Sequence, residues 1–192
     1  IPRPDTEVLV ETAVKALRGR KMDARVLDLC TGSGCIGCAI ASELPAAHVV
    51  LVDNSKKALA VAKQNILKNR LNPRVTCVET DALLPPPPVL GSFELLCCNP
   101  PYIMSDEIAA LDASVKDFEP LAALDGGGDG LVFYRSIIPK WKSVVRPGGL
   151  MIFEVGEGQS GPVAELMKKN GLSNVGSVKD TGGVERVVCG NV

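Results

Sequence analysis

Four consecutive residues at positions 99–102, Asn-Pro-Pro-Tyr, have the groups needed to hold a planar amide or amino group. They directly follow the apolar run 93–98, which predicts a short buried strand. Neither proline has an N–H to donate to a sheet ladder, so the chain must leave the sheet here. The Asn99 side chain and the Pro100 carbonyl offer hydrogen-bond acceptors, and Tyr102 offers a flat ring. This pattern suits chemistry on an amide or amino nitrogen.

A glycine-rich turn follows the strand predicted for residues 25–30. Asp28 lies near the end of that strand, and Gly32 and Gly34 allow the backbone to approach a ligand closely. No lysine follows Gly34, so the turn lacks the signature of a phosphate-binding P-loop. With Gly37, however, the turn matches the dinucleotide-binding pattern Gly-x-Gly-x-x-Gly. A Rossmann dehydrogenase therefore remains an alternative at this point.

Acidic residues follow the next two predicted strands. Asp53 ends the strand predicted for 48–53, at the spacing where an acid binds ribose hydroxyls in nucleotide-binding folds. Asp81 follows the strand predicted for 74–79 and is placed to meet an adenine amino group. In an open α/β sheet, ligands bind at the carboxyl ends of the strands. We therefore expect the glycine-rich turn, the two acids and the turn at 99–102 to border one crevice.

The alternation of strand and helix patterns predicts a parallel sheet with right-handed crossovers. The last two strands are expected to form a hairpin at its edge. The predicted strands cover residues 25–30, 48–53, 74–79, 93–98, 149–155, 174–180 and 185–190, and the predicted helices cover 5–17, 35–43, 55–69, 129–145 and 159–170.

The composition is that of a single folded domain with weak net charge. The chain has 192 residues, of which 46% are apolar, and a net charge of −1. This charge does not favour broad binding to a nucleic-acid backbone. There is no apolar run of the roughly 20 residues needed to span a bilayer. The seven cysteines lie mostly in apolar runs, as expected of reduced, buried thiols in an intracellular protein.

As a set, these motifs resemble those of class I S-adenosylmethionine-dependent methyltransferases that act on planar nitrogen. Further stretches narrow the resemblance to the HemK (PrmC) family, which methylates the glutamine side-chain amide of peptide chain release factors. Two positions depart from that family, since Cys30 replaces a usual glycine and Phe118 a common tyrosine. The stretches that carry the resemblance are 1–7, 28–34, 52–55, Asp81, 99–102, 118–127, 129–131, 134–135, 153–159 and 180–186.

The resemblance implies a Rossmann-like α/β fold, with a seven-stranded, mostly parallel sheet and helices on both faces. It implies S-adenosylmethionine as the cofactor, S-adenosylhomocysteine as the product, and no metal. The implied cofactor-binding residues are Asp28, Thr31, Gly32, Ser33, Gly34, Asp53, Asn54, Asp81, Ala82 and Asn99. The implied catalytic residues are Asn99, Pro100, Pro101 and Tyr102, and the implied substrate-binding residues are Asn99, Pro100, Tyr102 and Glu119.

The resemblance also predicts the organisation and setting of the protein. Residues 1–20 would hold an entry helix and residues 21–192 the methyltransferase domain. A small helical substrate-binding domain would precede this chain in the whole protein. The expected partner is a release factor, with no membrane and no nucleic acid, and the expected state is a monomer. The expected location is the cytoplasm, or a mitochondrion or plastid for a eukaryotic source.

Two other functions stay open from the residues alone. A nucleic-acid N-methyltransferase could use the same grip on an adenine or guanine amino group, although the mild acidity counts against it. An NAD-binding module would leave Asp81 and the turn at 99–102 unexplained.

His48 is the single histidine and begins a strand, so a histidine general base is not expected. Cys35 and Cys38 form a C-x-x-C within a predicted helix, where core packing is commoner than metal binding.

Overall fold

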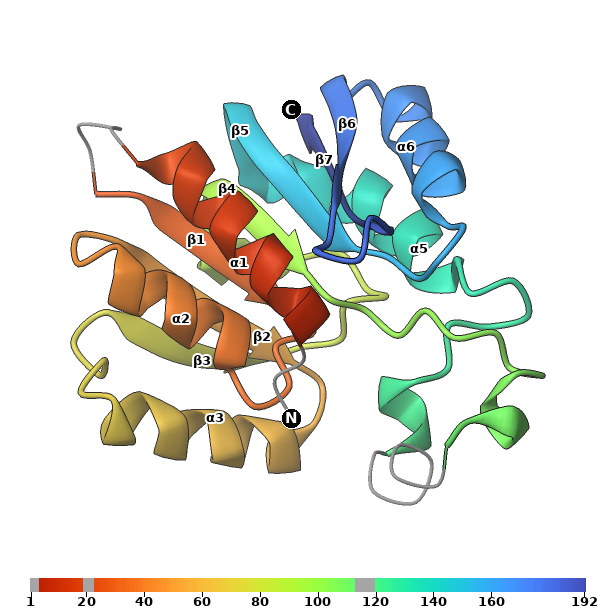
Figure 1. The fold of residues 1–192 in the computed structure, drawn as a ribbon. Coiled ribbons are helices and arrows are strands. Elements are labelled where there is room, and N and C mark those ends of the chain that lie inside the picture. Colours follow the sequence, from red (N-terminus) through yellow and green to blue (C-terminus); the bar gives the residue numbers. More distant parts are fainter. Residues whose placement is uncertain (1–3, 19–22, 113–119) are drawn as a thin grey trace.

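The computed structural model describes residues 4–18, 23–112 and 120–192, which form one seven-stranded sheet with helices on both faces (Figure 1). The strand order is β3-β2-β1-β4-β5-β7-β6, and the neighbours from β3 to β5 are parallel while β7 is antiparallel to β5 and β6. The predicted α/β fold class is therefore confirmed. The strands are β1 (Arg25–Leu29), β2 (His48–Asp53), β3 (Val75–Glu79), β4 (Phe93–Cys98), β5 (Val145–Glu154), β6 (Ser173–Lys179) and β7 (Glu185–Asn191). The helices are α1 (Pro4–Leu17), α2 (Cys35–Glu43), α3 (Lys56–Lys68), α5 (Val132–Trp141) and α6 (Ser160–Lys169), with short 3-10 helices at Pro88–Leu90, Ile108–Ala110, Leu121–Ala123 and Lys142–Val144.

The sheet separates two hydrophobic layers, because successive strand residues point to opposite faces. Val26 packs with residues of α1, α2 and α3, whereas its neighbour Leu27 packs with residues of α5 and α6. Leu9 of α1 is fully buried in the first layer. The entry helix is thus part of the same core as the sheet. Within the described residues, no helix has the length and apolar content to cross a membrane.

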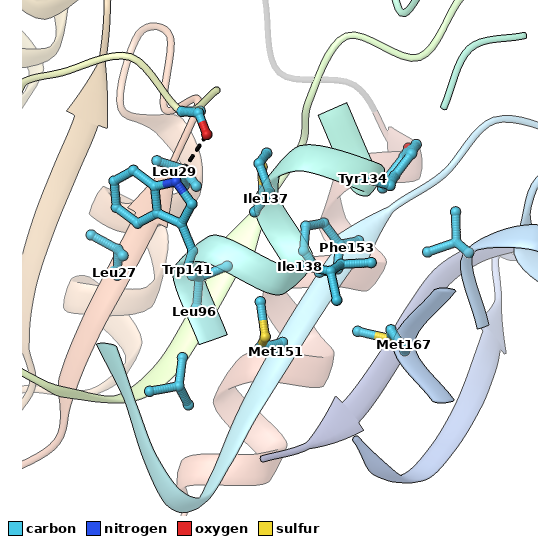
Figure 2. Packing of buried hydrophobic residues seen from close by; sticks show 14 of the residues in the cluster. Leu27, Leu29, Leu96, Tyr134, Ile137, Ile138, Trp141, Met151, Phe153 and Met167 are labelled. Carbon is cyan, nitrogen blue, oxygen red and sulfur yellow. Dashed lines mark hydrogen bonds between the residues drawn. The ribbon is translucent and has the colours of Figure 1, made fainter. Parts of the chain in front are cut away.

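The second layer is built around Trp141 at the end of α5. Figure 2 shows its indole beside Leu27, Leu29 and Leu96. The indole Nε1 donates to the Ala82 carbonyl at 2.9 Å, drawn dashed in Figure 2, and to the Leu84 carbonyl at 3.1 Å. A buried indole N–H needs such a partner. The contact therefore ties the loop after β3 to the core.

The boundaries of α5 and β5 differ from the prediction. Gly130 has a φ of +69°, which is not helical, so α5 begins at Val132 instead of residue 129. The helix ends at Trp141, and β5 begins at Val145, four residues earlier than predicted. The Arg-Pro-Gly-Gly sequence at 146–149 therefore lies within the strand instead of before it. It is accommodated by a shift in register, since Val145 pairs with Phe93 of β4 before regular pairing resumes further along β5.

Candidate active site

A cavity of about 500 Å³ lies at the carboxyl ends of β1, β2, β3 and β4. The four predicted strand ends therefore do border one crevice, and a loop that leads into α5 adds a further wall. Its volume is in the usual range for a small-molecule site. The lining residues include Cys30, Thr31, Gly32 and Ser33 after β1, Asp53 and Asn54 at β2, Asp81 and Ala82 after β3, Asn99, Pro100, Pro101 and Tyr102 after β4, and Pro120, Ala122, Ala123 and Leu124 in the further wall.

The glycine-rich turn is shaped by backbone conformations that favour glycine. Gly32 and Gly34 have φ values of +56° and +79°, and Cys30 at +58° adopts the same region despite its side chain. A side chain at Gly34 would place Cβ 2.9 Å from Leu51 Cδ1, so the start of α2 packs closely on β2. The Asn65 side-chain amide of α3 also donates to the Ser33 carbonyl at 2.8 Å. The turn is therefore held by contacts with β2 and α3.

Asp28 supports this turn from below. Its Oδ2 accepts hydrogen bonds from Thr31 Oγ1 at 2.5 Å and from the Gly37 N–H at 2.9 Å. The side chain is fully buried, and this burial raises the pKa of the carboxyl from 3.8 to about 7. The two hydrogen bonds act in the opposite direction, but their effect on the pKa is smaller. Neither Asp28 nor Gly34 is among the residues that line the cavity. In this structure both residues shape the turn, and their direct contact with the cofactor stays a prediction.

Asp53 connects the ends of the first two strands. Its Oδ2 accepts a hydrogen bond from the Gly32 N–H and its Oδ1 one from the Ser55 N–H, both at 2.8 Å. The N-cap of α3 is Ser55, whose hydroxyl accepts from the Ala58 N–H at 3.2 Å. Ser55, rather than Asp53, therefore caps α3. Since a carboxylate oxygen can accept more than one hydrogen bond, Asp53 can still bind hydroxyl groups in the cavity.

Asp81 and Ala82 form the part of the wall that follows β3. Asp81 Oδ1 accepts from the Leu83 N–H at 2.8 Å, which closes a tight turn. The Ala82 carbonyl accepts from the buried Trp141 indole. The position of these two lining residues is therefore set by the hydrophobic core as well as by the local turn.

All four residues of the turn at 99–102 contribute to the wall of the cavity. Pro100 and Pro101 are buried, whereas Asn99 and Tyr102 are partly exposed, and all four line the cavity. The Tyr102 hydroxyl donates to Glu154 Oε1 at 3.4 Å. The Tyr102 carbonyl accepts from the Gln159 side-chain amide at 2.8 Å. The turn is thus attached to β5 and to the loop that follows it.

Glu154 is a residue of the site to which the sequence analysis assigned no role. It ends β5, lines the cavity and is 1% exposed. It obeys the same rule that identified Asp53, an acid at the carboxyl end of a parallel strand, so this signal was present in the sequence. Cys30, Phe133 and Leu124 also line the cavity, and no pattern of residue types singled them out as lining residues.

Other sequence predictions concern residues outside the cavity. Glu119 and Phe118 lie outside the described residues. His48 lies at the opposite, amino-terminal edge of β2, and Cys38 is buried among the residues of α1, α2 and α3. Within the described ranges there is no group of three or more His, Cys, Asp or Glu residues that would hold a metal ion.

The sheet order, the glycine-rich turn and the two strand-end acids define the S-adenosylmethionine-dependent methyltransferase fold. The solved S-adenosylmethionine-dependent methyltransferase SibL has this fold, with a TM-score of 0.67 at 15% identity, covering 97% of this chain and 55% of that one. The family model described as Methyltransferase small domain matches residues 4–120.

More similar proteins define the family within this class. The release factor glutamine methyltransferase of Geobacter sulfurreducens is 43% identical over 100% of this chain and 65% of its own length. The solved release-factor-specific protein-(glutamine-N5) methyltransferase of Alicyclobacillus acidocaldarius is 30% identical, with a TM-score of 0.60 over 99% of this chain and 93% of that one. The chain belongs to the release factor glutamine methyltransferase family. It spans about two thirds of the length of the curated relatives that it matches, such as 66% of the Clostridium acetobutylicum protein.

Proposed function

We propose that this chain transfers a methyl group from S-adenosylmethionine to the side-chain amide nitrogen of the glutamine in the Gly-Gly-Gln motif of a peptide chain release factor. One observation carries the proposal: the Asn99–Tyr102 turn lines the same cavity as Asp53 and Asp81. Acceptors for a planar amide thus lie beside acceptors for a nucleoside. The family membership supports the glutamine amide as the acceptor rather than a nucleic-acid base.

The donor set of the cavity fits S-adenosylmethionine. Asp53 has carboxylate oxygens for the ribose hydroxyls, and Asp81 has one for the adenine amino group. Leu29, Val52 and Val61 supply apolar wall at the same cavity. The backbone of Gly32 comes close to the open space, since a Cβ at this position would meet no atom within 4 Å. We assign this end of the cavity to the cofactor.

The other end of the cavity has the groups to orient an amide. When bound, S-adenosylmethionine supplies an electrophilic methyl group on a sulfonium that is a good leaving group. The glutamine amide is a weak nucleophile, because its lone pair is delocalised into the carbonyl. The Asn99 side-chain oxygen and the Pro100 carbonyl accept the two amide N–H groups, which orients the nitrogen and stabilises its developing positive charge. Tyr102 packs against the planar group, and the proton leaves to solvent after transfer.

The test is methyl transfer to purified substrates. The chain is incubated with S-adenosylmethionine and a bacterial-type release factor, with duplex DNA in a parallel reaction, and the methyl group is located by mass spectrometry. A single methyl group on the glutamine of the Gly-Gly-Gln motif is the expected result. A release factor with that glutamine replaced by asparagine is the matched control and should remain unmodified. Methylation of DNA alone would overturn the proposed substrate. The monomeric state and the cytoplasmic location remain predictions.

A further inference from the structure

Gln159 bridges two segments that border the active site. It precedes α6, and its side chain uses both ends of the amide. Its Oε1 accepts a hydrogen bond from the Gly156 N–H at 3.0 Å, and its Nε2 donates to the Tyr102 carbonyl at 2.8 Å. Gly156 lies just beyond β5, and Tyr102 ends the Asn-Pro-Pro-Tyr turn after β4. One side chain outside the lining of the cavity thus fixes the distance between the turn and the end of the neighbouring strand.

Glycines allow this bridge to form at close range. A Cβ at Gly130 would overlap both Gln159 Nε2 and the Tyr102 carbonyl oxygen. A Cβ at Gly126 would lie 2.7 Å from Tyr102 Cα, and one at Gly156 would lie 3.1 Å from Tyr102 Cδ2. Three glycines from two loops therefore pack directly against this residue. The backbone of Tyr102 has little room to move once the bridge is made.

We propose that Gln159 is a positioning residue, which holds the Asn-Pro-Pro-Tyr turn in the geometry that methyl transfer requires. This inference rests on the proposed function, since it assigns the Asn99 side chain and the Pro100 carbonyl to the amide. Both acceptors lie within three residues of the carbonyl that Gln159 holds. The separate bond from the Tyr102 hydroxyl to Glu154 fixes the ring, whereas Gln159 fixes the backbone. A displacement of about 1 Å in a reacting group can lower a rate about 100-fold.

The decisive variant is Gln159→Glu, because it keeps the shape of the side chain and changes one end of it. A carboxylate at this position still accepts from the Gly156 N–H but has no hydrogen to donate to the Tyr102 carbonyl. We expect the kcat for release-factor methylation at pH 8 to fall about 10- to 100-fold, with the Kd for S-adenosylhomocysteine changed less than about twofold. The matched control is Asn170→Asp, which removes a similar amide donor, to the Leu166 carbonyl, from the other end of α6. The control should keep the kcat of the parent chain.

The pH profile distinguishes positioning from a general loss of structure. At lower pH the carboxyl introduced at position 159 becomes protonated and regains a donor for the Tyr102 carbonyl. The ratio of the variant's kcat to the parent's should therefore rise as the pH falls from 8 to 6. A flat or falling ratio, or an unchanged kcat at pH 8, would overturn the proposal.

A spectroscopic measurement tests the bridge without methyl transfer. The chain has two tyrosines, so fluorotyrosine labelling gives two ¹⁹F resonances, which Tyr102→Phe assigns. Gln159→Glu should shift or broaden the Tyr102 resonance and leave that of Tyr134, which is fully buried in the core, in place. An unchanged Tyr102 resonance would contradict the bridge. If the parent chain methylates no release factor, the proposed function fails, while this measurement still decides whether Gln159 holds the turn.

A second variant approaches the same hydrogen bond from the opposite side. Gly130→Ala inserts a methyl group between Gln159 Nε2 and the Tyr102 carbonyl, and should reproduce the ¹⁹F change and the loss of kcat. Gly183→Ala is the control for backbone strain, because Gly183 also has a positive φ, +84°, but its Cβ would meet no atom within 4 Å. Equal effects of the two alanines on the Tyr102 resonance would overturn the assignment. Should Gln159→Glu fail to fold, the Gly130 variant decides the question.

Discussion

The Asp53 carboxylate accepts a hydrogen bond from the Gly32 N–H at 2.8 Å, which joins the loop after β1 to the end of β2 across the candidate cofactor site. The same residue is therefore both a predicted ligand for ribose and a support for the glycine-rich turn. Asp53→Ala removes both roles. We expect the Kd for S-adenosylhomocysteine, measured by calorimetry, to rise about 10- to 100-fold, because hydrogen bonds to a charged group contribute about 1.5–3 kcal/mol.

Glu79→Ala provides the matched control for Asp53. Glu79 pairs in register with Asp53 from β3 and is also a strand-end acid, but it does not line the cavity. Its ion pair with Lys56, at 3.8 Å, lies on the surface. Its removal should leave cofactor affinity unchanged. Equal losses in the two variants would mean that charge at this edge of the sheet, rather than the Asp53 contacts, governs binding.

The pKa of Asp28 predicts a dependence of stability on pH. Burial raises this pKa from 3.8 to about 7, so the folded chain holds a proton between these values that the unfolded chain has released. The contribution of Asp28 to the free energy of unfolding therefore falls as the pH rises from about 4 to about 7. Asp28→Asn removes this titration. We therefore expect the free energy of unfolding of the variant, minus that of the parent chain, to be larger at pH 8 than at pH 5. Urea unfolding of both proteins at the two pH values measures this difference.

The same variant tests how Asp28 serves the site. An asparagine oxygen can still accept from Thr31 Oγ1 and the Gly37 N–H, so the turn should keep its shape. We expect the affinity for S-adenosylhomocysteine to change only a few-fold. A loss of affinity as large as that of Asp53→Ala, with no change in the pH dependence of stability, would instead indicate a direct contact of Asp28 with the cofactor.

The grouping of the strand ends at the site could be predicted from the sequence. A parallel sheet brings the carboxyl ends of its strands to one edge, independently of the side chains that they carry. Asp53, Asp81 and Asn99 could therefore be placed beside one another from their positions after predicted strands. The direction in which a strand-end side chain points could not be predicted in the same way. Whether Asp28 faces the cavity or the core depends on the direction of its side chain at the end of β1, and a glycine-rich turn suits either case.

The parts that could not be predicted from the sequence depend on contacts between distant residues. The early start of β5 depends on the pairing of Val145 with Phe93, which lies 52 residues earlier in the chain. The bridge from Gln159 to Tyr102 spans 57 residues and leaves no signal in the spacing of either. Glu154 carries the signal of a strand-end acid, but the strand predicted for 149–155 runs one residue past it, which hides its place at the edge of the sheet.

Trp141 should matter for stability and for the cofactor site together. Trp141→Phe keeps most of the buried ring but leaves the Ala82 and Leu84 carbonyls without the indole N–H. Loss of a buried hydrogen-bond donor costs about 1–3 kcal/mol, which urea unfolding would measure. Because Ala82 lines the cavity, cofactor affinity should also fall. Ser143→Ala, which removes an exposed hydroxyl just beyond the same helix, should change neither quantity. A destabilised variant with unchanged affinity would show that the loop after β3 keeps its position without the indole.

Asn99→Ala should separate catalysis from cofactor binding. The substitution removes one of the two acceptors assigned to the substrate amide and leaves the contacts of Asp53 and Asp81 in place. Removal of one hydrogen-bonding group that stabilises a transition state typically lowers kcat about 100- to 1,000-fold. We therefore expect a loss of that order in release-factor methylation under saturating S-adenosylmethionine, with the Kd for S-adenosylhomocysteine within about threefold of the parent, because the cofactor contacts remain. Asp53→Ala should show the opposite pattern, a large change in Kd and a smaller one in kcat. Equal losses of kcat and affinity in Asn99→Ala would contradict this division, because the Asn99 side chain would then bind the cofactor as strongly as it orients the amide.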